Sequence, residues 1–523
     1  MSNFENKIFN LTDAAAALDE GRFCERVSHT YGIRGETCAD FVLPDYMGDV
    51  KRLLKSSASV SLANKYTGSA EVSFLMMVSY RVTYIDSEEK LTEAVFDSDY
   101  EYNAKCQDGF VDAFLNTRVD GIHVRLQGPR KISARAALIS DLSVTERCKI
   151  SDICDFAQKE IKETAVNIHK AEFLSFPKCE HAVEIGRLEG VGSDEIEVIK
   201  SDAKLIVESC ERHDDRIVIS GGIHAFCLLR VNEDIIRLEK ELPYESSIVC
   251  DGEQKSSGFL PSGGICSVGV HLNSEIGDGA DAGVFYTAVV MDMTSESFAS
   301  CNYNVEYPLI SDAFECGAVN ECGYRVFSYD ELVASVFERR KVGFTIERDG
   351  TPIRSILDSD VRLSGYHYEI CGSDIVVHGV AEYNIIVGGM TQGECAGIRG
   401  EREIEERIRL SDALRNQENV NSHICVMPCE VSVTFDGEKI YMNFTLSVLG
   451  FVSAEKSERI LTSLVSTKKT TEGRRIIVYY PKCGEDLWGI AKKYSVPVSE
   501  VGRRAIRDEA ADGAFSRVII EER

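Results

Sequence analysis

The 523-residue chain lacks a long apolar run and a surplus of positive charge. No apolar stretch reaches the roughly 18 residues that a membrane-spanning helix needs, and even residues 72–85 contain Ser73, Ser79 and Arg81. Lys and Arg total 58 against 85 Asp and Glu, which gives a net charge of −27. Nucleic acids and anionic membranes attract basic patches. The composition therefore predicts a soluble protein with no nucleic-acid partner and no direct membrane insertion.

Proline, metal-binding cysteine pairs and a leader segment are also scarce or missing. The 10 Pro and the lack of a low-complexity stretch leave no obvious flexible linker, so we expect closely coupled domains. None of the 18 Cys forms a Cys-x-x-Cys pair, and Cys425 and Cys429 have no His pair nearby, so no metal or cofactor is predicted. Residues 1–7 lack a basic region followed by an apolar region, which predicts reduced thiols and no signal peptide.

Motifs that carry catalysis are missing as well. The Gly-rich stretch Ser262, Gly263 and Gly264 lacks the Lys and Ser or Thr of a phosphate-binding loop. No His-Glu-x-x-His, no Gly-x-Ser-x-Gly and no Gly-x-Gly-x-x-Gly after a strand occurs in the chain. We therefore expect no catalytic residue and predict that the protein is not an enzyme.

Apolar residues instead alternate with a period of two, which is typical of strands. The first such run is Val72, Phe74, Met76, Val78, Tyr80, Val82 and Tyr84. A polar break at residues 86–89 leads to residues 91–96, which predicts a hairpin.

The same pattern returns twice, at residues 217–238 and 375–408, and each time a second strand pair follows. In the third occurrence that pair is joined by Asp436 and Gly437, a strong hairpin signal. The sequence thus predicts a mainly β protein with three related β-rich units in tandem, at residues 1–150, 181–320 and 346–466.

Two stretches between these units have helical spacing. Residues 153–169 place Ile153, Phe156, Ile161, Ala165 and Ile168 on one face, and residues 330–340 do the same with Leu332, Val333, Val336 and Phe337. We expect them to form helical connectors, within residues 151–180 and 321–345.

The last segment, residues 474–523, predicts a small α+β module. Asp486 is placed to cap a helix in which Leu487, Ile490, Ala491 and Tyr494 share one face. Residues 496–501 open a second short helix. Apolar strands at 476–478 and 518–520 complete the order strand–helix–helix–strand.

This order and the run Gly484, Glu485, Asp486 and Leu487 resemble the LysM module, which usually binds peptidoglycan or chitin. The resemblance implies a binding surface made of Gly484, Glu485, Asp486, Leu487, Trp488, Ile490, Val496 and Pro497. Four departures fall mostly on the ligand side. The usual Gly-Asp-Thr-Leu is Gly-Glu-Asp-Leu, an Asn is replaced near Ala505, acidic residues are inserted at 508–512, and the ending at 516–520 is reduced. Because the core positions are kept better, protein docking is favoured over glycan binding.

The whole chain resembles spore coat morphogenetic proteins, in which β-sandwich or barrel-like SPOCS domains precede a C-terminal LysM module. The matching segments are residues 41–46 (FVLPDY), the strand pair ending at Tyr84, and residues 130–138 (RKISARAAL). The resemblance implies a non-catalytic scaffold in the mother-cell cytoplasm at the forespore surface. There it would dock the ATPase of the coat's basement layer and other coat proteins. A protein that binds peptidoglycan or its lipid-linked precursors remains the alternative.

Overall fold

The computed structural model describes residues 22–68, 71–106, 110–151, 159–250, 258–276, 285–347, 353–389, 391, 394–410, 420–436, 439–469, 475–482, 485–507 and 515–522. The described residues are 85% strand and 4% helical, which confirms the predicted mainly β class. No helix among the described residues has the length and apolar character needed to cross a membrane.

The strands fall into three successive units and a C-terminal module. The first unit contains β1 (Arg22–Val42), β2 (Val50–Thr67), β3 (Glu71–Asp86), β4 (Leu91–Lys105), β5 (Phe110–Gly128) and β6 (Lys131–Ser151). The second contains β7 (Lys159–Ser175), β8 (Cys179–Glu189), a short 3₁₀ turn (Ser193–Glu195), β9 (Ile196–His213), β10 (Arg216–Val231), β11 (Asp234–Val249), β12 (Gly258–Ile276) and β13 (Phe285–Glu315). The third contains β14 (Ala318–Glu347), β15 (Ser355–Cys371), β16 (Asp374–Gly388), β17 (Cys395–Arg409), β18 (Val420–Phe435) and β19 (Lys439–Lys468). The module contains β20 (Arg475–Tyr479), α1 (Leu487–Tyr494), α2 (Val498–Arg504), β21 (Ala505–Arg507) and β22 (Phe515–Glu522).

Each unit has the same antiparallel topology. The last strand lies between the first strand and the one before last, in the orders β1-β6-β5, β7-β13-β12 and β14-β19-β18. The three strands between them form a second sheet, in the orders β2-β3-β4, β9-β10-β11 and β15-β16-β17. Only the second unit adds β8, which pairs with the first part of β13 beyond the end of β7.

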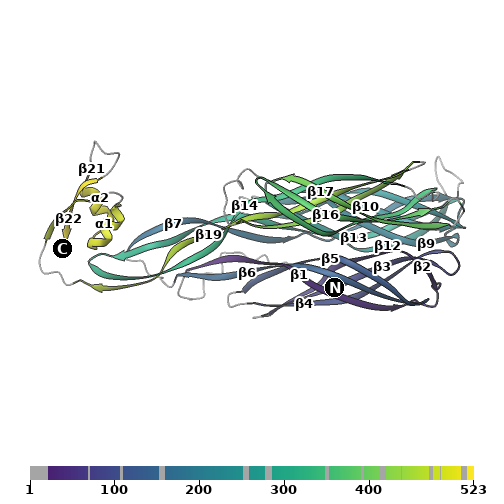
Figure 1. The fold of residues 1–523 in the computed structure, drawn as a ribbon, viewed down its shortest axis with the longest axis horizontal. Coiled ribbons are helices and arrows are strands. Elements are labelled where there is room, and N and C mark those ends of the chain that lie inside the picture. The colour runs from purple at the N-terminus through teal and green to yellow at the C-terminus, as the bar shows by residue number, and fades with distance from the viewer. Residues whose placement is uncertain are drawn as a thin grey trace.

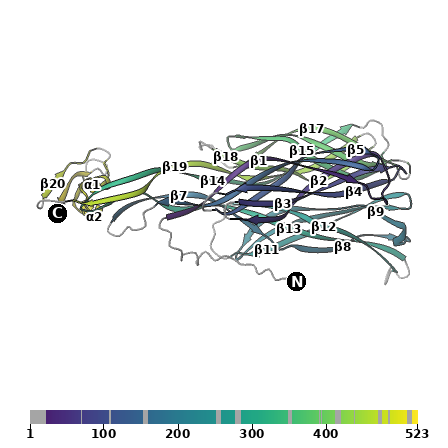
Figure 2. The same cartoon turned by 90° about the horizontal axis from the view of Figure 1, so that it is seen from below.

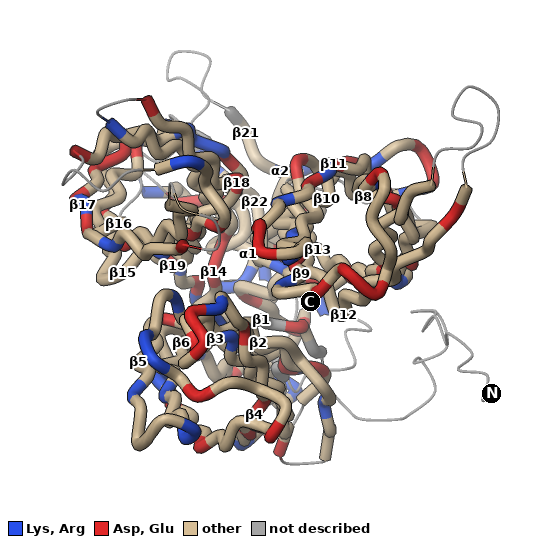
Figure 3. The backbone as a smooth tube through the Cα atoms, turned by 90° about the vertical axis from the view of Figure 1, so that its right-hand side faces the viewer, with Lys and Arg blue, Asp and Glu red and all other residues tan. Residues whose placement is uncertain are grey.

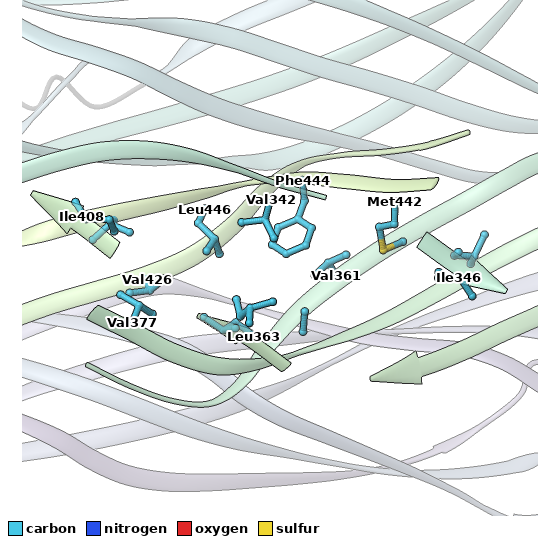
Figure 4. Close-up of a cluster of buried hydrophobic side chains, with 14 of the residues drawn as sticks. Val342, Ile346, Val361, Leu363, Val377, Ile408, Val426, Met442, Phe444 and Leu446 are labelled. Carbon is cyan, nitrogen blue, oxygen red and sulfur yellow. The ribbon is translucent and has the colours of Figure 1, made fainter. Parts of the chain in front are cut away.

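The core of each unit lies between its two sheets. The alternating side chains predicted for β3, from Val72 to Tyr84, are all buried, and the predicted hairpin pairs Ile85 with Leu91. In the third unit Phe444 and Leu446 of β19 face Val361 and Leu363 of β15 across the core (Figure 4). Period-two alternation therefore located these sheets correctly, because one face of each strand is buried.

The two predicted helical connectors are wrong, because both stretches are strands. Residues 159–169 belong to β7 and residues 330–340 lie inside β14, while Ile153 and Phe156 fall outside the described residues. A register shift between Leu332 and Ala334 changes which face of β14 is buried. The buried residues Tyr329, Leu332 and Val336 consequently follow the i, i+3, i+7 spacing of a helix.

The three units pack around a common axis, and the module sits at one end of the elongated body (Figures 1 and 2). Viewed along this axis, the strands gather into three groups, one for each unit (Figure 3). Equivalent apolar residues of β2, β9 and β15, namely Leu54, Ile199 and Leu357, share one buried cluster. Ile85 of β3, Leu228 of β10 and Ile386 of β16 belong to it as well.

Charged groups cross all three interfaces beside this cluster. Each pair of units is joined by an arginine that donates to a backbone carbonyl oxygen: Arg81 to Ser201 at 2.8 Å, Arg237 to Leu357 at 2.9 Å and Arg399 to Leu54 at 2.9 Å. Asp358 is buried, and its carboxylate lies 2.9 Å from Nζ of both Lys55 and Lys200. Lys55, Lys200 and Asp358 come from three different units, so this buried triad holds the body together at its axis.

Candidate functional site

The C-terminal module has the order of helices and strands that the sequence predicted, with an additional short strand, β21. β20 and β21 both pair with β22, and the two helices cover one face of this sheet. Its core contains Ile490, Ala491, Val496, Val501, Val518 and Ile520. Phe314, at the end of β13, is fully buried in the same cluster. The body therefore contributes a core residue to the module, and the two parts form one packed structure.

Asp486 caps α1 as the sequence predicted. Its Oδ1 accepts a hydrogen bond from the backbone N–H of Gly489 at 2.8 Å, which satisfies one of the free amides of the first helical turn. Its Oδ2 lies 3.1 Å from Nζ of Lys162 in β7. The hydrogen bond from the Gly489 amide, and to a smaller extent the one from Lys162, keeps the pKa of Asp486 below its ordinary value. The first turn of α1 is thus anchored on the body.

Glu485 is held inside the module. Its carboxylate accepts hydrogen bonds from the Tyr479 hydroxyl at 2.8 Å and from the backbone N–H of Lys482 at 2.9 Å. These two hydrogen bonds lower the pKa of Glu485, and the one from the Lys482 amide has the larger effect. The side chain therefore shapes the loop before α1.

Trp488 contacts the body and is half-buried. Its indole N–H donates to Oδ2 of Asp312 at 2.8 Å, and its ring packs edge-on against Phe314 with centroids 5.1 Å apart. Lys492 and the Tyr324 hydroxyl bind the other oxygen, Oδ1, of the same aspartate. Burial would raise the pKa of Asp312, but the hydrogen bonds from these three side chains outweigh it and lower the pKa.

The end of α1 is fixed to the turn between β13 and β14. Ser495 donates through Oγ to the carbonyl oxygen of Ala318 at 2.8 Å, and its own carbonyl accepts from the N–H of Gly317 at 2.8 Å. Together with the Asp312 and Lys162 contacts, these bonds attach both ends of α1 to the body.

The other predicted site residues are structural or lie elsewhere. Ile490 and Val496 are buried in the module core, and Leu487 packs against it. Pro497 precedes α2, where its carbonyl oxygen accepts from the amides of Glu500 and Val501. Gly484 lies outside the described residues. Trp488, Ile490 and Val496 thus face the body or the core of the module, whereas the Asp486 side chain is 58% exposed and Glu485 is bonded within the module.

The solvent-facing side of the module sheet presents a surface that sequence reasoning missed. It consists of exposed apolar side chains, with exposed fractions of 75% for Ile476, 49% for Val478, 68% for Tyr480, 40% for Ile506 and 37% for Ile519. Val478 lies directly opposite Ile519 in the register of β20 and β22. We name these five residues the outer face. Residues 476–480 are apolar without interruption, so a strand with only one covered face necessarily exposes about half of them. This uninterrupted apolar run was the feature of the sequence from which the outer face could have been predicted.

Among the described residues no group of three or more His, Cys, Asp or Glu is arranged to hold a metal ion. The buried Cys227, Cys301 and Cys425 are free thiols. No family model, curated protein or solved structure matches the chain.

Proposed function

We propose that the protein is a non-catalytic scaffold of spore coat assembly, built from SPOCS-type β units and a LysM-type docking module. In this proposal the module binds the ATPase of the coat's basement layer at the forespore surface, on the mother-cell side. The resemblance of the sequence to this class of proteins gives the class of partner. The outer face is the single observation that carries the choice of protein over glycan.

The contacts of the loop before α1 support that choice. Asp486 and Trp488 bind Lys162 and Asp312 of the body, and Glu485 is bonded to Tyr479 within the module. A glycan that used these side chains would have to displace contacts that the chain already makes. The outer face requires no such displacement, because its apolar side chains lie in solvent.

The chemistry of the outer face indicates what it would bind. Contiguous exposed apolar side chains are typical of protein interfaces. The exposed residues Arg475 and Arg517 lie on the same two strands, β20 and β22. We expect a partner surface with an apolar centre and acidic groups at its rim, with Tyr480 as the largest contact.

Binding of the purified coat ATPase to the full-length chain tests the proposal. The full chain is needed because Phe314 of the body completes the module core. We expect the double variant Val478→Lys and Ile519→Lys to weaken binding by well over tenfold, since it places two charges in an apolar interface. Val249→Lys is the control, because Val249 is an exposed strand residue at the end of β11, outside the module.

Unchanged ATPase binding by the double variant would contradict docking through the outer face. Purified peptidoglycan is offered to the same proteins in parallel. Retention of the chain on peptidoglycan, combined with no binding to the ATPase, would establish the glycan-binding alternative and reject the scaffold proposal.

A further inference from the structure

Three histidines from the three units meet at the axis of the body. His29 of β1, His169 of β7 and His423 of β18 surround Phe451 of β19, with ring centroids 5.0, 4.8 and 5.8 Å from the phenylalanine ring. His29 stacks on His169 at 6.1 Å. Tyr31 stacks between His29 and His423, at 5.6 and 4.2 Å. We call His29, His169 and His423 the histidine cluster.

Two of these rings have neutral hydrogen-bond partners only. His29 shares a hydrogen bond of 2.9 Å between Nδ1 and the Ser143 hydroxyl, while its Nε2 is buried and has no partner among the described residues. His169 is 4% exposed, and its Nε2 lies 3.0 Å from Oδ1 of Asn302. A proton added to either ring would create a buried cation without an anionic acceptor.

One carboxylate beside the cluster, that of Asp141, is already occupied. Asp141 of β6 lies 3.9 Å from Nε2 of His423, but it is already bound by Arg118 of β5 at 2.9 Å and by the amide of Gly32 at 2.9 Å. Asp330 of β14 interacts electrostatically with Tyr31. Arg118 and the neighbouring rings oppose any further positive charge.

The titration of the rings agrees with this geometry. Burial, followed by repulsion from the other two histidines, lowers the pKa of His29 to about 3. Burial lowers the pKa of His169 to about 4, against the opposing effect of the hydrogen bond to Oδ1 of Asn302. For His423, burial outweighs Asp141, and its pKa is lowered too. All three rings are therefore neutral in the packed body at neutral pH.

We propose that the histidine cluster is an acid-sensitive latch, which holds the three units together around Phe451 at neutral pH and lets them separate there when the rings take up protons. The residues come from β1, β7 and β18, so protonation acts on all three interfaces at once. Separation of the units would expose the rings to water, where each can be charged. The apolar cores inside the units contain none of these rings and are expected to stay packed.

Linkage gives the size and direction of the effect. A ring that titrates at 6.5 when exposed and near 3 or 4 when packed favours the open state as the pH falls through 6.5. Between pH 7 and pH 5 the ratio of open to packed molecules rises by about 25-fold for each such ring. His29 and His169 together therefore give a rise of several hundred-fold.

Hydroxyl-radical footprinting of the full-length chain tests the latch. We expect the Phe451 side chain, which is 6% exposed and lies among the three rings, to lose most of its protection from oxidation between pH 7 and pH 5. Tyr80, which is fully buried inside the first unit, serves as the internal reference. Equal protection at the two pH values around the cluster would overturn the proposal.

Variants connect that loss to the rings. The double change His29→Gln and His169→Gln is expected to remove most of the pH dependence, whereas His213→Gln, at a ring whose side chain is 65% exposed, leaves it unchanged. A double variant with the pH dependence of the original chain would overturn the latch.

Histidine NMR titration of the unaltered protein decides the matter if the double variant does not fold. Resonances of His29 and His169 that keep neutral shifts until protection is lost would support the latch. Titration of both rings near pH 6.5 in a body that stays protected would overturn it.

Discussion

Asp358→Asn is the most informative single perturbation of the body. The Asp358 carboxylate is 3% exposed and lies 2.9 Å from Nζ of both Lys55 and Lys200. Asparagine has nearly the same shape but no charge. The substitution would leave two ammonium groups buried at the axis without the anion that they share.

The expected cost follows from the burial of these charges. Removal of one member of a buried ion pair typically costs about 3–5 kcal/mol, because the remaining charge stays desolvated. Glu93 lies 3.3 Å from Lys200 and keeps one acid beside it, whereas Lys55 has no other ion-pair partner among the described residues. We expect Asp358→Asn to lower the free energy of unfolding by about 3–5 kcal/mol, with most of the loss arising at Lys55.

Equilibrium unfolding in urea, monitored by circular dichroism, measures this loss. Urea is uncharged, so it does not screen the ion pairs. Asp360→Asn is the matched control, because Asp360 lies two residues along the same strand, is 28% exposed and is 3.6 Å from Lys204. That change should cost under about 1 kcal/mol. In a double-mutant cycle, Lys55→Met combined with Asp358→Asn should cost less than the sum of the single changes. Equal losses for Asp358→Asn and Asp360→Asn would refute the assigned role of the triad.

Three further predictions follow from the same contacts. The lysines hold the pKa of Asp358 well below its ordinary value despite burial, so the stability that Asp358 provides should persist down to about pH 4 and be lost only below that. The buried histidines destabilise the packed body from about pH 6.5 downwards, so acid unfolding of the original chain should show two phases. Acid unfolding of Asp358→Asn should show only the phase that begins near pH 6.5. Phe314→Ala should destabilise the module by about 3–5 kcal/mol and shift the emission of Trp488, the only tryptophan, to longer wavelength in a thermal melt. Gly450→Ala should cost at least about 1–3 kcal/mol, since a Cβ there would lie 1.9 Å from the carbonyl oxygen of His423, while Gly264→Ala, with open space around it, should be neutral in urea unfolding.

Sequence patterns located those features whose signal is local. The alternation from Val72 to Tyr84 identified β3 because one face of this strand is buried throughout. Asp486 was identifiable as a cap because a cap acts on the helical turn that follows it. Each of these predictions used residues close together in the chain.

The remaining features depend on contacts between distant residues. Trp488 and Asp312 are 176 positions apart, so nothing beside Trp488 in the sequence shows that its indole binds the body. β14 was misassigned because a register shift at Leu332 changes its buried face and produces helical spacing. His29, His169 and His423 likewise come from strands of three units. Periodicity cannot bring such residues together, because their proximity depends on how the units pack.

The triad at the axis also suggests why three similar units are joined in one chain. Lys55, Lys200 and Asp358 each follow an apolar residue of the same buried cluster, namely Leu54, Ile199 and Leu357. Three identical units around this axis would bring three like charges together in a buried place, and no acid would take the third position. Covalent linkage removes that constraint, because the third unit supplies Asp358 where the first two supply lysine. The difference at this one position makes the three interfaces unequal.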